Sequence, residues 1–361
     1  SLMNRYVFKR LNNMQTQCKR CVMDGSATEI VFTDTGCNFC DTAVKQEKIR
    51  LSEIKNHRKV IDAIKKAGKG KKYDCLLGLS GGVDSSTCLM KLVENGIRPL
   101  CFSLDNGWND PKADANVERL VKKAGVTHIN HKIDLEKFKE LQTAFLRGGI
   151  KNVEATTDHI LFALTYKMIV DNKLKYVISG GNQATESIMP ASWGEDARDL
   201  YWIKSVYKAI IGRKLTGLPT ISLLREQYYR LFKKFKTINL LDYYTYDREE
   251  AIKKLQEWCG YEPYGEKHCE SVWTHWFQNY YLFEKWGIDK RKAHLSSLIM
   301  SGQMTRDEAL HEISKCPVYP ELGIEQKVMR YPKRSYDDYP NSRKVRRLVS
   351  KLYRYAKLLV S

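Results

Sequence analysis

A stretch rich in glycine and serine, between a short apolar run and a helical pattern, is the first segment whose residue types could do chemistry. It reads Leu79-Ser80-Gly81-Gly82-Val83-Asp84-Ser85-Ser86. Its glycines allow the backbone to approach an anion closely, and the helix that follows offers unpaired N–H groups and a positive dipole end. The string lacks the Gly-Lys-Ser/Thr ending of a Walker loop, and it is not a dinucleotide fingerprint. We predict that this loop binds phosphate through its backbone and hydroxyl groups.

The one carboxylate in this loop, Asp84, needs a separate role because it would repel a phosphate. Proteins hold Mg²⁺ with one or two carboxylates together with the oxygens of substrate phosphates. We therefore predict that Asp84 is a catalytic residue that holds a Mg²⁺ ion bridging the phosphates. The plain alternative for the whole loop is a glycine turn before a helix.

Polar segments also follow two later apolar runs. Ligands of a doubly wound sheet lie beyond the carboxyl ends of its strands. We predict that the first segment contacts adenine and ribose and that the second lets the same nucleotide approach closely. A polar turn and a strand-ending bend are the alternatives. The residues concerned are Ser103, Asp105, Asn106 and Gly107 in the first segment and Ser179, Gly180 and Gly181 in the second.

Four cysteines near the N-terminus have the spacing of a metal site. Cys18 and Cys21 form one C-x2-C pair, Cys37 and Cys40 form another, and fifteen residues separate the pairs. Two knuckles that each present two thiolates to a tetrahedral ion are typical of structural zinc. Four thiolates leave no open position, so we predict a zinc ion that supports folding. Unrelated free thiols or redox pairs are the alternative.

Several polar and aromatic residues near the expected strand ends are candidates for contacting a substrate. Asp158 and His159 begin a helical pattern, and we predict catalytic roles for both; a helix cap and a half-buried histidine are the alternatives. The predicted substrate-binding residues are Asn182, Glu186, Trp193, Lys267 and His268. For these five, a loop or core position is the alternative.

The elements that must position these residues alternate regularly. Strands separated by helices pair in parallel through right-handed crossovers. The fold class is therefore α/β, with a doubly wound parallel sheet of the Rossmann type, an N-terminal zinc-knuckle module and an α-rich C-terminal region. Apolar runs predict strands at 73–79, 99–104, 127–133 and 175–179, and helical patterns lie at 85–95, 113–124 and 156–172.

Three regions follow from this pattern. Residues 1–44 form the four-cysteine module, 45–190 the α/β domain, and 191–361 a helical region for substrate or partner contacts. From residue 327 to 361 there are eleven Lys/Arg against two Asp, which predicts either a solvated basic helix or a site for an anion or partner. Helices in the last region are predicted at 222–236, 247–258, 272–286, 291–300 and 305–314.

The overall composition indicates which partners suit the chain. Its 361 residues carry a formal net charge of +19, which favours nucleotides, diphosphate-linked substrates, nucleic acid or an acidic protein. No run approaches the roughly 18 apolar residues of a membrane span, and no signal-peptide pattern is visible. We therefore expect a cytoplasmic protein, in a reducing compartment, with no membrane contact.

The loop Ser80–Ser86 resembles that of the PP-loop ATP pyrophosphatases, which are HUP-like enzymes that split ATP between its α and β phosphates. Further strings resemble the N-acetyl sugar amidotransferases of surface-polysaccharide and nonulosonic-acid pathways, and this resemblance spans residues 18 to about 315. The strings are Cys18-Lys19-Arg20-Cys21-Val22-Met23-Asp24, Gly36-Cys37-Asn38-Phe39-Cys40, Thr157-Asp158-His159-Ile160-Leu161-Phe162, Ser179-Gly180-Gly181-Asn182 and Lys267-His268-Cys269-Glu270-Ser271-Val272-Trp273-Thr274.

This resemblance implies a reaction on the acetamido group of a UDP-linked or similar nucleotide-linked sugar. Adenylylation of the acetamido oxygen and its replacement by ammonia would give an acetamidino sugar, AMP and pyrophosphate in O-antigen or other lipopolysaccharide biosynthesis. The implied cofactors are ATP, Mg²⁺ and structural Zn²⁺. A separate glutaminase of the histidine-biosynthesis type, with a cyclase-like companion, would supply ammonia, since no nucleophilic Cys elbow with a paired His is visible here.

Two other functions stay open. A PP-loop tRNA-modifying enzyme, of the thiolation or lysidine type, is favoured by the charge of +19. Thiolation needs a positioned catalytic cysteine, however, and Cys259 and Cys269 lack an obvious pairing, so nucleic acid is the less favoured partner. The other possibility is a zinc-ribbon scaffold whose ATP loop is inactive.

Overall fold

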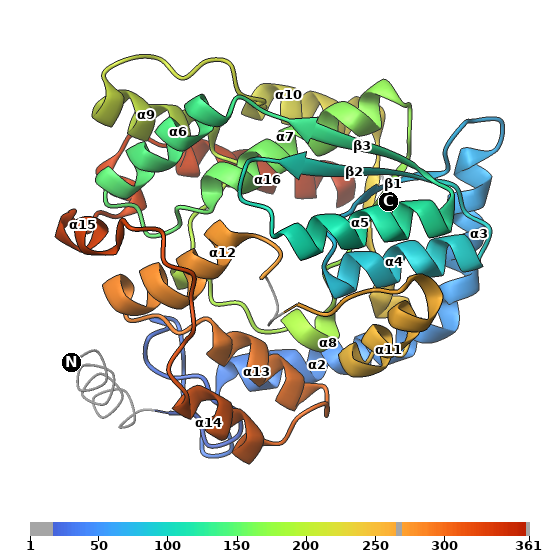
Figure 1. The fold of residues 1–361 in the computed structure, drawn as a ribbon, viewed down its shortest axis with the longest axis horizontal. Coiled ribbons are helices and arrows are strands. Elements are labelled where there is room, and N and C mark those ends of the chain that lie inside the picture. Colours follow the sequence, from blue (N-terminus) through green and yellow to red (C-terminus); the bar gives the residue numbers. More distant parts are fainter. Residues whose placement is uncertain (1–16, 265–268, 359–361) are drawn as a thin grey trace.

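A five-stranded parallel sheet forms the centre of the computed structural model, which describes residues 17–264 and 269–358 (Figure 1). The strand order is β3-β2-β1-β4-β5, and each neighbouring pair is parallel. This confirms the predicted fold class. The strands are β1 (Cys75–Gly78), β2 (Pro99–Asp105), β3 (Thr127–Lys132), β4 (Tyr176–Ser179) and β5 (Lys236–Asn239).

Helices surround this sheet and fill the C-terminal half of the chain. They are α2 (Asn38–Glu53), α3 (His57–Gly68), α4 (Val83–Glu94), α5 (Pro111–Ala124), α6 (Leu135–Arg147), α7 (Ala155–Asp171), α8 (Gln183–Glu186), α9 (Leu200–Ile211), α10 (Leu223–Tyr228), α11 (Arg248–Cys259), α12 (Val272–Trp276), α13 (Arg291–Met300), α14 (Arg306–Ser314), α15 (Glu325–Arg330) and α16 (Arg343–Leu358). Short 3-10 turns lie at Ile54–Asn56, Ala191–Trp193, Leu240–Tyr243 and Tyr336–Asp338, and π-helical segments at Tyr229–Lys233 and Phe277–Trp286. Among the described residues, no helix combines the length and the apolar character that crossing a membrane requires.

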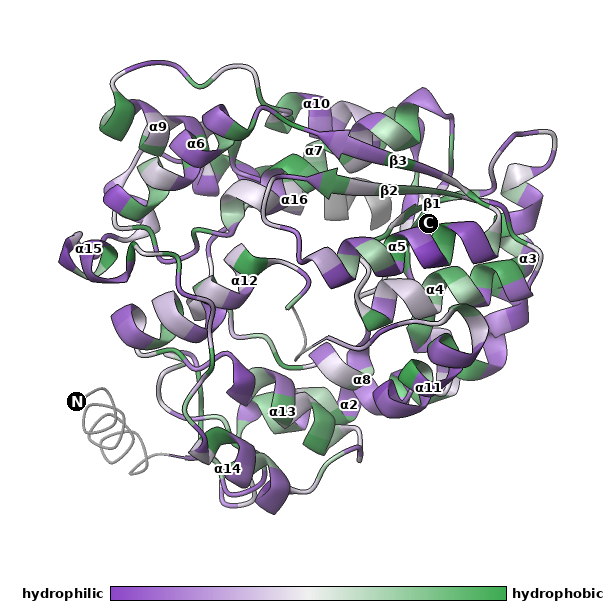
Figure 2. Cartoon of the chain, viewed as in Figure 1, coloured by the Kyte–Doolittle hydropathy of each residue, from purple (hydrophilic) through white to green (hydrophobic). Residues whose placement is uncertain are grey.

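The two faces of the sheet bury separate cores, because neighbouring residues of a strand point to opposite faces. On β1, Leu77 packs with apolar residues of α3, α4, α5 and α11, whereas Leu76 packs with those of α6, α7 and α9. Figure 1 shows α4, α5 and α11 on one side of the sheet and α7 and α10 on the other. Figure 2 shows β3, at the edge of the sheet, as mostly hydrophilic, in agreement with its exposed side chains.

The order of the strands in the sheet reverses between β1 and β4. From β1 the sheet grows through β2 to β3 on one side, whereas β4 and β5 extend it on the other. Such a switch point leaves a crevice beyond the carboxyl ends of the two central strands, where ligands of doubly wound folds bind. The glycine loop follows β1 and the segment starting at Gly180 follows β4, so both reach this crevice.

The strand β5 is the element of the sheet that sequence patterns missed. It lies within 191–361, where only helices were predicted, and it has four residues of which Ile238 alone is apolar. Its backbone pairing with β4, from Tyr176↔Lys236 to Ser179↔Asn239, defines it. A short edge strand of this kind carries no alternating pattern for the sequence to display.

The C-terminal helices pack around the N-terminal module and the crevice. The helix predicted at 291–300 has those bounds as α13, and the helices predicted at 247–258 and 305–314 lie within one residue of α11 and α14. The range 272–286 is α-helical only to Trp276 and continues as a π-helical segment. Helix α13 packs against α2, α8 and α14, so it joins the N-terminal module to the loop after β4.

Candidate active site

The glycine loop forms a tight backbone turn between β1 and α4. Gly81 has a φ of 79°, in the left-handed region, and a Cβ added there would lie 2.3 Å from the carbonyl oxygen of Ala113. The hydroxyl of Tyr261 donates to the carbonyl of Gly81 at 2.9 Å. Beside the loop, a Cβ on Gly180 would lie 3.1 Å from the amide nitrogen of Ser85, so the segments after β1 and β4 pass in close contact. Only glycine fits these two positions without a shift of the backbone.

A cavity of about 490 Å³ opens beside this loop. Ser80, Gly82, Val83, Asp84 and Ser85 line it from the loop side. Gly81 and Ser86 support the loop from behind, since Ser86 is buried and its hydroxyl donates to the carbonyl of Gly82 at 2.7 Å. The opposite wall consists of Glu186, Arg248, Glu249, Ile252, Tyr261, Pro263, Tyr264 and Glu270.

Asp84 lies in the first turn of α4 and faces this cavity. The hydroxyl of Tyr246 donates to its Oδ1 atom. Burial, and after it the carboxylate of Asp84, hold the pKa of Tyr246 well above its usual range, so this hydroxyl keeps its proton. Asp84, Glu186 and Glu270 all line this cavity, and carboxylate oxygens are ligands that Mg²⁺ prefers, whereas the only described cluster of ligand atoms close enough to share one ion is that of the four cysteines.

A larger cavity of about 790 Å³ adjoins the first, and both share Gly78, Ser80, Glu186 and Glu270. One wall comes from the loop and from the end of β2, where Ser103 and Asn106 lie. The rest of the lining comes mainly from residues near the start of α7, from 186–196 and from 270–290. Parts of the chain far apart in sequence therefore meet over the carboxyl edge of the sheet.

Two carboxylates at the start of α7 project into the larger cavity. Glu154 and Asp158 are four residues apart, which places them on one side of the helix. The hydroxyl of Thr274, on α12, donates to Glu154 Oε2 at 3.0 Å. Burial, and after it the charge of Asp158, raise the pKa of Glu154.

The basic partner of this pair is Lys290, whose side chain lines the same cavity. Burial raises the pKa of Asp158, and the charge of Lys290 opposes this rise. Burial in turn lowers the pKa of Lys290, against the attraction of Asp158, Glu154 and Glu186. The pKa of each of these three groups is shifted toward neutrality, a pattern that is common at sites of proton transfer.

The prediction of a catalytic role for His159 is not supported by its surroundings. The ring is buried, with an exposed fraction of 2%, and it is not among the residues that line either cavity. Its Nδ1 atom bonds to the carbonyl of Ala197 at 2.8 Å, and the amide of Ile221 donates to Nε2 at 3.3 Å. Both nitrogens are engaged by backbone, and burial lowers the pKa of the ring, so neutral His159 ties α7 to two loops.

Asn182 also has a structural position instead of the predicted contact with substrate. Its exposed fraction is 3%, and its Oδ1 atom accepts from the amide of Thr185 at 2.9 Å, which caps α8. Its amide nitrogen donates to the carbonyl of Gly180 at 3.3 Å. Glu186, at the end of the same helix, is the residue of this segment that reaches both cavities.

Some of the other predicted residues line a cavity, and others only make local hydrogen bonds near one. Trp193 lines the larger cavity, but its ring is 2% exposed and its indole N–H donates to the carbonyl of Ser26 at 3.1 Å.

At the end of β2, Asp105 accepts from the amide of Gly107 at 3.2 Å, and neither of them lines a cavity. After β4, Ser179 accepts from the amide of Gly181 at 3.0 Å, and only Gly180 lines a cavity. Lys267 and His268 lie outside the described residues.

Sequence reasoning missed several residues of the cavity walls. Glu154 precedes the predicted Asp158 by one helical turn, and that spacing was a usable signal. Glu270 stands in a string that resembles the N-acetyl sugar amidotransferases, which was also a signal. Arg248, Tyr264 and Lys290 had none, because tertiary packing alone brings them to the loop.

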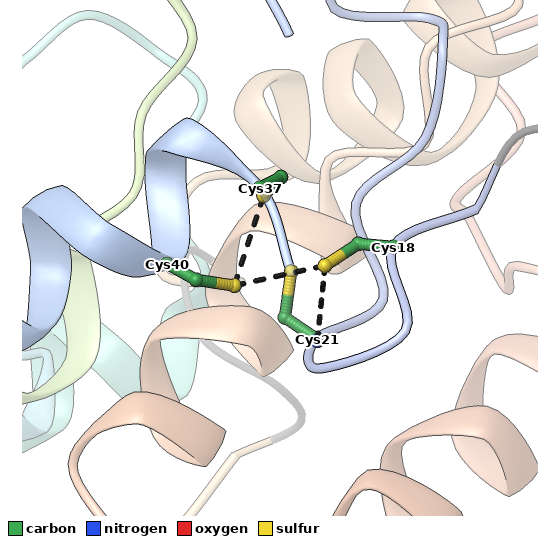
Figure 3. A group of neighbouring side chains, drawn as sticks. All are labelled: Cys18, Cys21, Cys37 and Cys40. Atoms are coloured by element: carbon green, nitrogen blue, oxygen red, sulfur yellow. Dashed lines mark hydrogen bonds between the residues drawn. The ribbon is translucent and has the colours of Figure 1, made fainter. Parts of the chain in front are cut away.

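The four cysteines form a second, separate site. Their Sγ atoms all lie within 4.8 Å of one another, and Figure 3 shows them pointing toward a common centre. The Sγ atom of Cys40 is 3.7 Å from those of Cys18 and Cys37. A tetrahedral ion with Zn–S bonds of about 2.3 Å separates its sulfurs by roughly 3.8 Å, so these thiolates fit such an ion. The predicted clustering is confirmed, while the identity of the metal stays a prediction.

The cysteine site is attached to the wall of the larger cavity. Arg306 donates to the carbonyls of Cys21 and Cys18, each at 3.1 Å, and the amide of Val22 donates to the hydroxyl of Ser296 at 3.2 Å. Lys292 on α13 pairs with buried Asp24. The N-terminal module therefore braces α13 and α14, and it also contacts the segment around Trp193.

Known proteins resemble this chain in part. Residues 270–331 match the family model for the C-terminal domain of the WbpG-like LPS biosynthesis proteins. The chain is also 22% identical over 312 residues to the uncharacterized protein MJ1599 of Methanocaldococcus jannaschii, an alignment that covers 85% of this chain and 96% of that relative. The match at 270–331 confirms, for that segment, the resemblance to surface-polysaccharide proteins.

Solved structures that match this chain do so at low sequence identity and low TM-score. The NH3-dependent NAD synthetase from Campylobacter jejuni is 15% identical, covers 74% of this chain and 98% of its own, and has a TM-score of 0.30. The U34-tRNA thiolase NcsA from Methanococcus maripaludis, solved with its [4Fe-4S] cluster, is 12% identical, covers 88% and 97%, and has a TM-score of 0.35. Similarity at this level says nothing about the chemistry of this chain.

Proposed function

We propose that this chain is an ATP-dependent, AMP-forming amidotransferase that converts the acetamido group of a nucleotide-linked N-acetyl sugar into an acetamidino group, in O-antigen or related lipopolysaccharide biosynthesis. One observation carries the proposal. The larger cavity is lined both by the glycine loop and by residues of 270–290, and the whole of this second segment lies within the match to a family of LPS biosynthesis proteins.

The smaller cavity is the proposed site of the triphosphate of ATP. Backbone N–H groups at the start of α4 and the hydroxyls of Ser80 and Ser85 would bind pyrophosphate. Arg248, across the cavity, offers a cation for the phosphates. Asp84, together with Glu186 or Glu270, would hold Mg²⁺, which when bound neutralises phosphate charge.

The larger cavity is the proposed site of the sugar. In the first step, the acetamido oxygen attacks the α-phosphorus of ATP, pyrophosphate leaves, and the amide N–H proton passes to pyrophosphate or solvent, giving a neutral O-adenylyl imidate. In the second, ammonia adds to the imidate carbon and AMP leaves with the former acetamido oxygen. The chain contributes the positioning of both substrates and a wall that excludes water from the imidate.

The two carboxylates at the start of α7 suit the proton transfer that this second step requires. Nitrogen from ammonia must lose a proton before AMP departs, and Glu154 and Asp158 are positioned in the cavity to accept it. The product amidine is a cation, whereas the starting amide is neutral. An acidic wall therefore favours the product side of the reaction electrostatically.

Ammonia is proposed to come from a separate glutaminase subunit of the histidine-biosynthesis type, with a cyclase-like companion. No described residue that lines the two cavities is a cysteine, so neither a glutaminase nucleophile nor a thiolation cysteine has a place there. For the four-cysteine site we propose zinc, since its four thiolates leave no position open for chemistry.

The purified full chain tests this function when it is given ATP, Mg²⁺, a set of UDP-linked N-acetyl sugars and ammonium chloride. The expected result is AMP and pyrophosphate in equal amounts that appear only when both a sugar and ammonium are present. AMP formation that depends on tRNA, with none for any sugar, would overturn the proposal in favour of a tRNA-modifying enzyme. No AMP with any acceptor would favour the inactive scaffold.

A further inference from the structure

Two adjoining helical segments, away from both cavities, carry apolar side chains that face solvent. On α10 and the π-helical segment that continues it, Leu224 is 83% exposed and Phe232 is 68% exposed. On α16, Leu348 and Leu352 are each 58% exposed. Together with Tyr228, Leu231 and Val345, which are also exposed, these residues form what we call the basic–apolar face.

Helical spacing gathers these side chains into two stripes. Tyr228 follows Leu224 by four residues, and Leu231 and Phe232 follow Tyr228 by three and four. Val345, Leu348 and Leu352 follow one another at intervals of three and four. In a folded protein such a stripe normally packs against the core. Here the stripes remain exposed, while other residues of the same helices attach them to the body of the protein.

A buried ion-pair network provides that attachment. Arg346 on α16 donates from Nη2 to Glu226 Oε2 on α10 at 3.0 Å and from Nε to Asp196 Oδ2 at 3.1 Å. Glu226 is 2% exposed, so the contact lies beneath the surface. Breaking a buried pair of this kind is costly, which keeps α10 and α16 next to each other.

The surroundings of both stripes are strongly basic. Within 222–236 and 343–352 the only acidic residue is Glu226, which is buried in the network just described. The exposed cations of these ranges are Arg225, Lys233, Lys234, Lys236, Lys344, Arg347 and Lys351. The face therefore combines apolar contact area with a positive field that no exposed carboxylate of these ranges offsets.

We propose that the basic–apolar face binds the surface of an anionic lipid bilayer. Helices with Leu and Phe on one side and Lys or Arg on the other lie in the headgroup region, with their apolar side chains in the acyl boundary. Anionic headgroups attract nearby Lys and Arg within a Debye length of the surface. The stripes are helix faces and none of their residues lines a described cavity, which suits a deformable surface better than a shaped ligand.

This proposal replaces the expectation of no membrane contact. That expectation rested on the lack of a spanning segment, and a helix that lies on a bilayer does not need to cross it. The proposal is independent of the amidotransferase reaction, because it uses no residue of the two cavities.

Co-sedimentation of the full chain with vesicles tests the proposal. We expect binding to phosphatidylcholine vesicles that contain phosphatidylglycerol, little binding to phosphatidylcholine alone, and loss of binding at high salt. The double variant Leu348→Ser/Leu352→Ser should bind at least about tenfold more weakly, and so should Leu224→Ser/Phe232→Ser. Val318→Ser, which changes an apolar residue of 77% exposure elsewhere, should bind as the wild type does.

A charge variant keeps the test decisive if a stripe variant folds poorly. Arg347→Glu/Lys351→Glu leaves both stripes intact and should lower affinity by about 25-fold or more, since each cation near the surface contributes about fivefold. Equal binding to neutral and anionic vesicles, or no binding to either, would overturn the proposal. Concentration-dependent self-association that the same substitutions abolish, without vesicle binding, would assign the face to a second copy of the chain instead.

Discussion

Asp84 and Glu154 have different roles in the proposed reaction, and their surroundings explain the division. Asp84 faces the smaller cavity, where Tyr246 donates to it and where we propose that ATP and its cation bind. Glu154 lines the larger cavity, the proposed sugar site, where burial raises its pKa. We therefore test the two residues with separate substitutions.

Replacing Asp84 by Asn should lower kcat by about 10²–10³-fold, because the amide lacks the charge that holds Mg²⁺. The Asn oxygen can still accept from Tyr246, so the melting temperature should change little. Steady-state AMP formation measures the first effect and thermal unfolding the second. Asp62→Asn, at an exposed position on α3, is the control. Full activity in the Asp84→Asn variant would refute the Mg²⁺ role.

Glu154→Gln tests the pKa of the buried carboxyl through stability. Burial, and after it the charge of Asp158, raise the pKa of Glu154 in the folded chain. A raised pKa stabilises the fold below the unfolded value of about 4.3, and this contribution is lost as pH rises through the folded value. The melting temperature of the wild type should therefore fall relative to that of the variant as pH rises through this range. Parallel curves, like those expected for exposed Glu118→Gln, would contradict the shift.

At the scale of elements, the strand–loop–helix unit from β1 to α4 sets the position of the proposed phosphate site. Substituting alanine at Gly81 or Gly125 costs roughly 1–2 kcal/mol, because both have φ in the left-handed region. Only Gly81 also meets a backbone atom, the carbonyl of Ala113 at 2.3 Å. Gly81→Ala should therefore lower the melting temperature more than Gly125→Ala and weaken ATP binding, as thermal unfolding and calorimetry would measure. Equal effects would show that the loop tolerates a Cβ.

The four-cysteine module is joined to α13 and α14 by hydrogen bonds and an ion pair. Cys18→Ser should lose the bound metal and lower the melting temperature, because it removes one thiolate of four and loosens the contact with Arg306. Metal analysis should find one zinc per chain in the wild type and in the exposed control Cys316→Ser. Iron in place of zinc would correct the metal, and unchanged metal content in Cys18→Ser would remove the site.

Sequence patterns predicted the elements that have strong local periodicity. Four of the five strands, the loop and α13 have close to the predicted bounds, and the cysteine spacing predicted the cluster. They missed β5, whose existence depends on pairing with β4, and the pocket wall around Lys290, which only tertiary packing brings to the loop. They also predicted a catalytic role for His159. The sequence cannot show whether the two ring nitrogens bond to backbone groups, as they do here, or to a substrate.

At the scale of the whole molecule, charge is distributed unevenly. The chain has a net charge of +19, yet among the described residues that line the larger cavity Lys290 is the only Lys, Arg or His, against seven acidic residues. Part of the basic charge lies instead on the basic–apolar face. This separation is consistent with the proposed reaction at the acetamido end of the sugar, where a neutral amide would become a cationic amidine.

The transfer of the acetamido oxygen to AMP is the central claim, and oxygen-18 labelling tests it most directly. A UDP-linked N-acetyl sugar that carries the label in its acetamido group is turned over with ATP, Mg²⁺ and ammonium, and the products are analysed by mass spectrometry. The account predicts one labelled oxygen in each AMP formed and none in pyrophosphate. Turnover that leaves AMP unlabelled, with the label retained in the sugar or released as water, would contradict it.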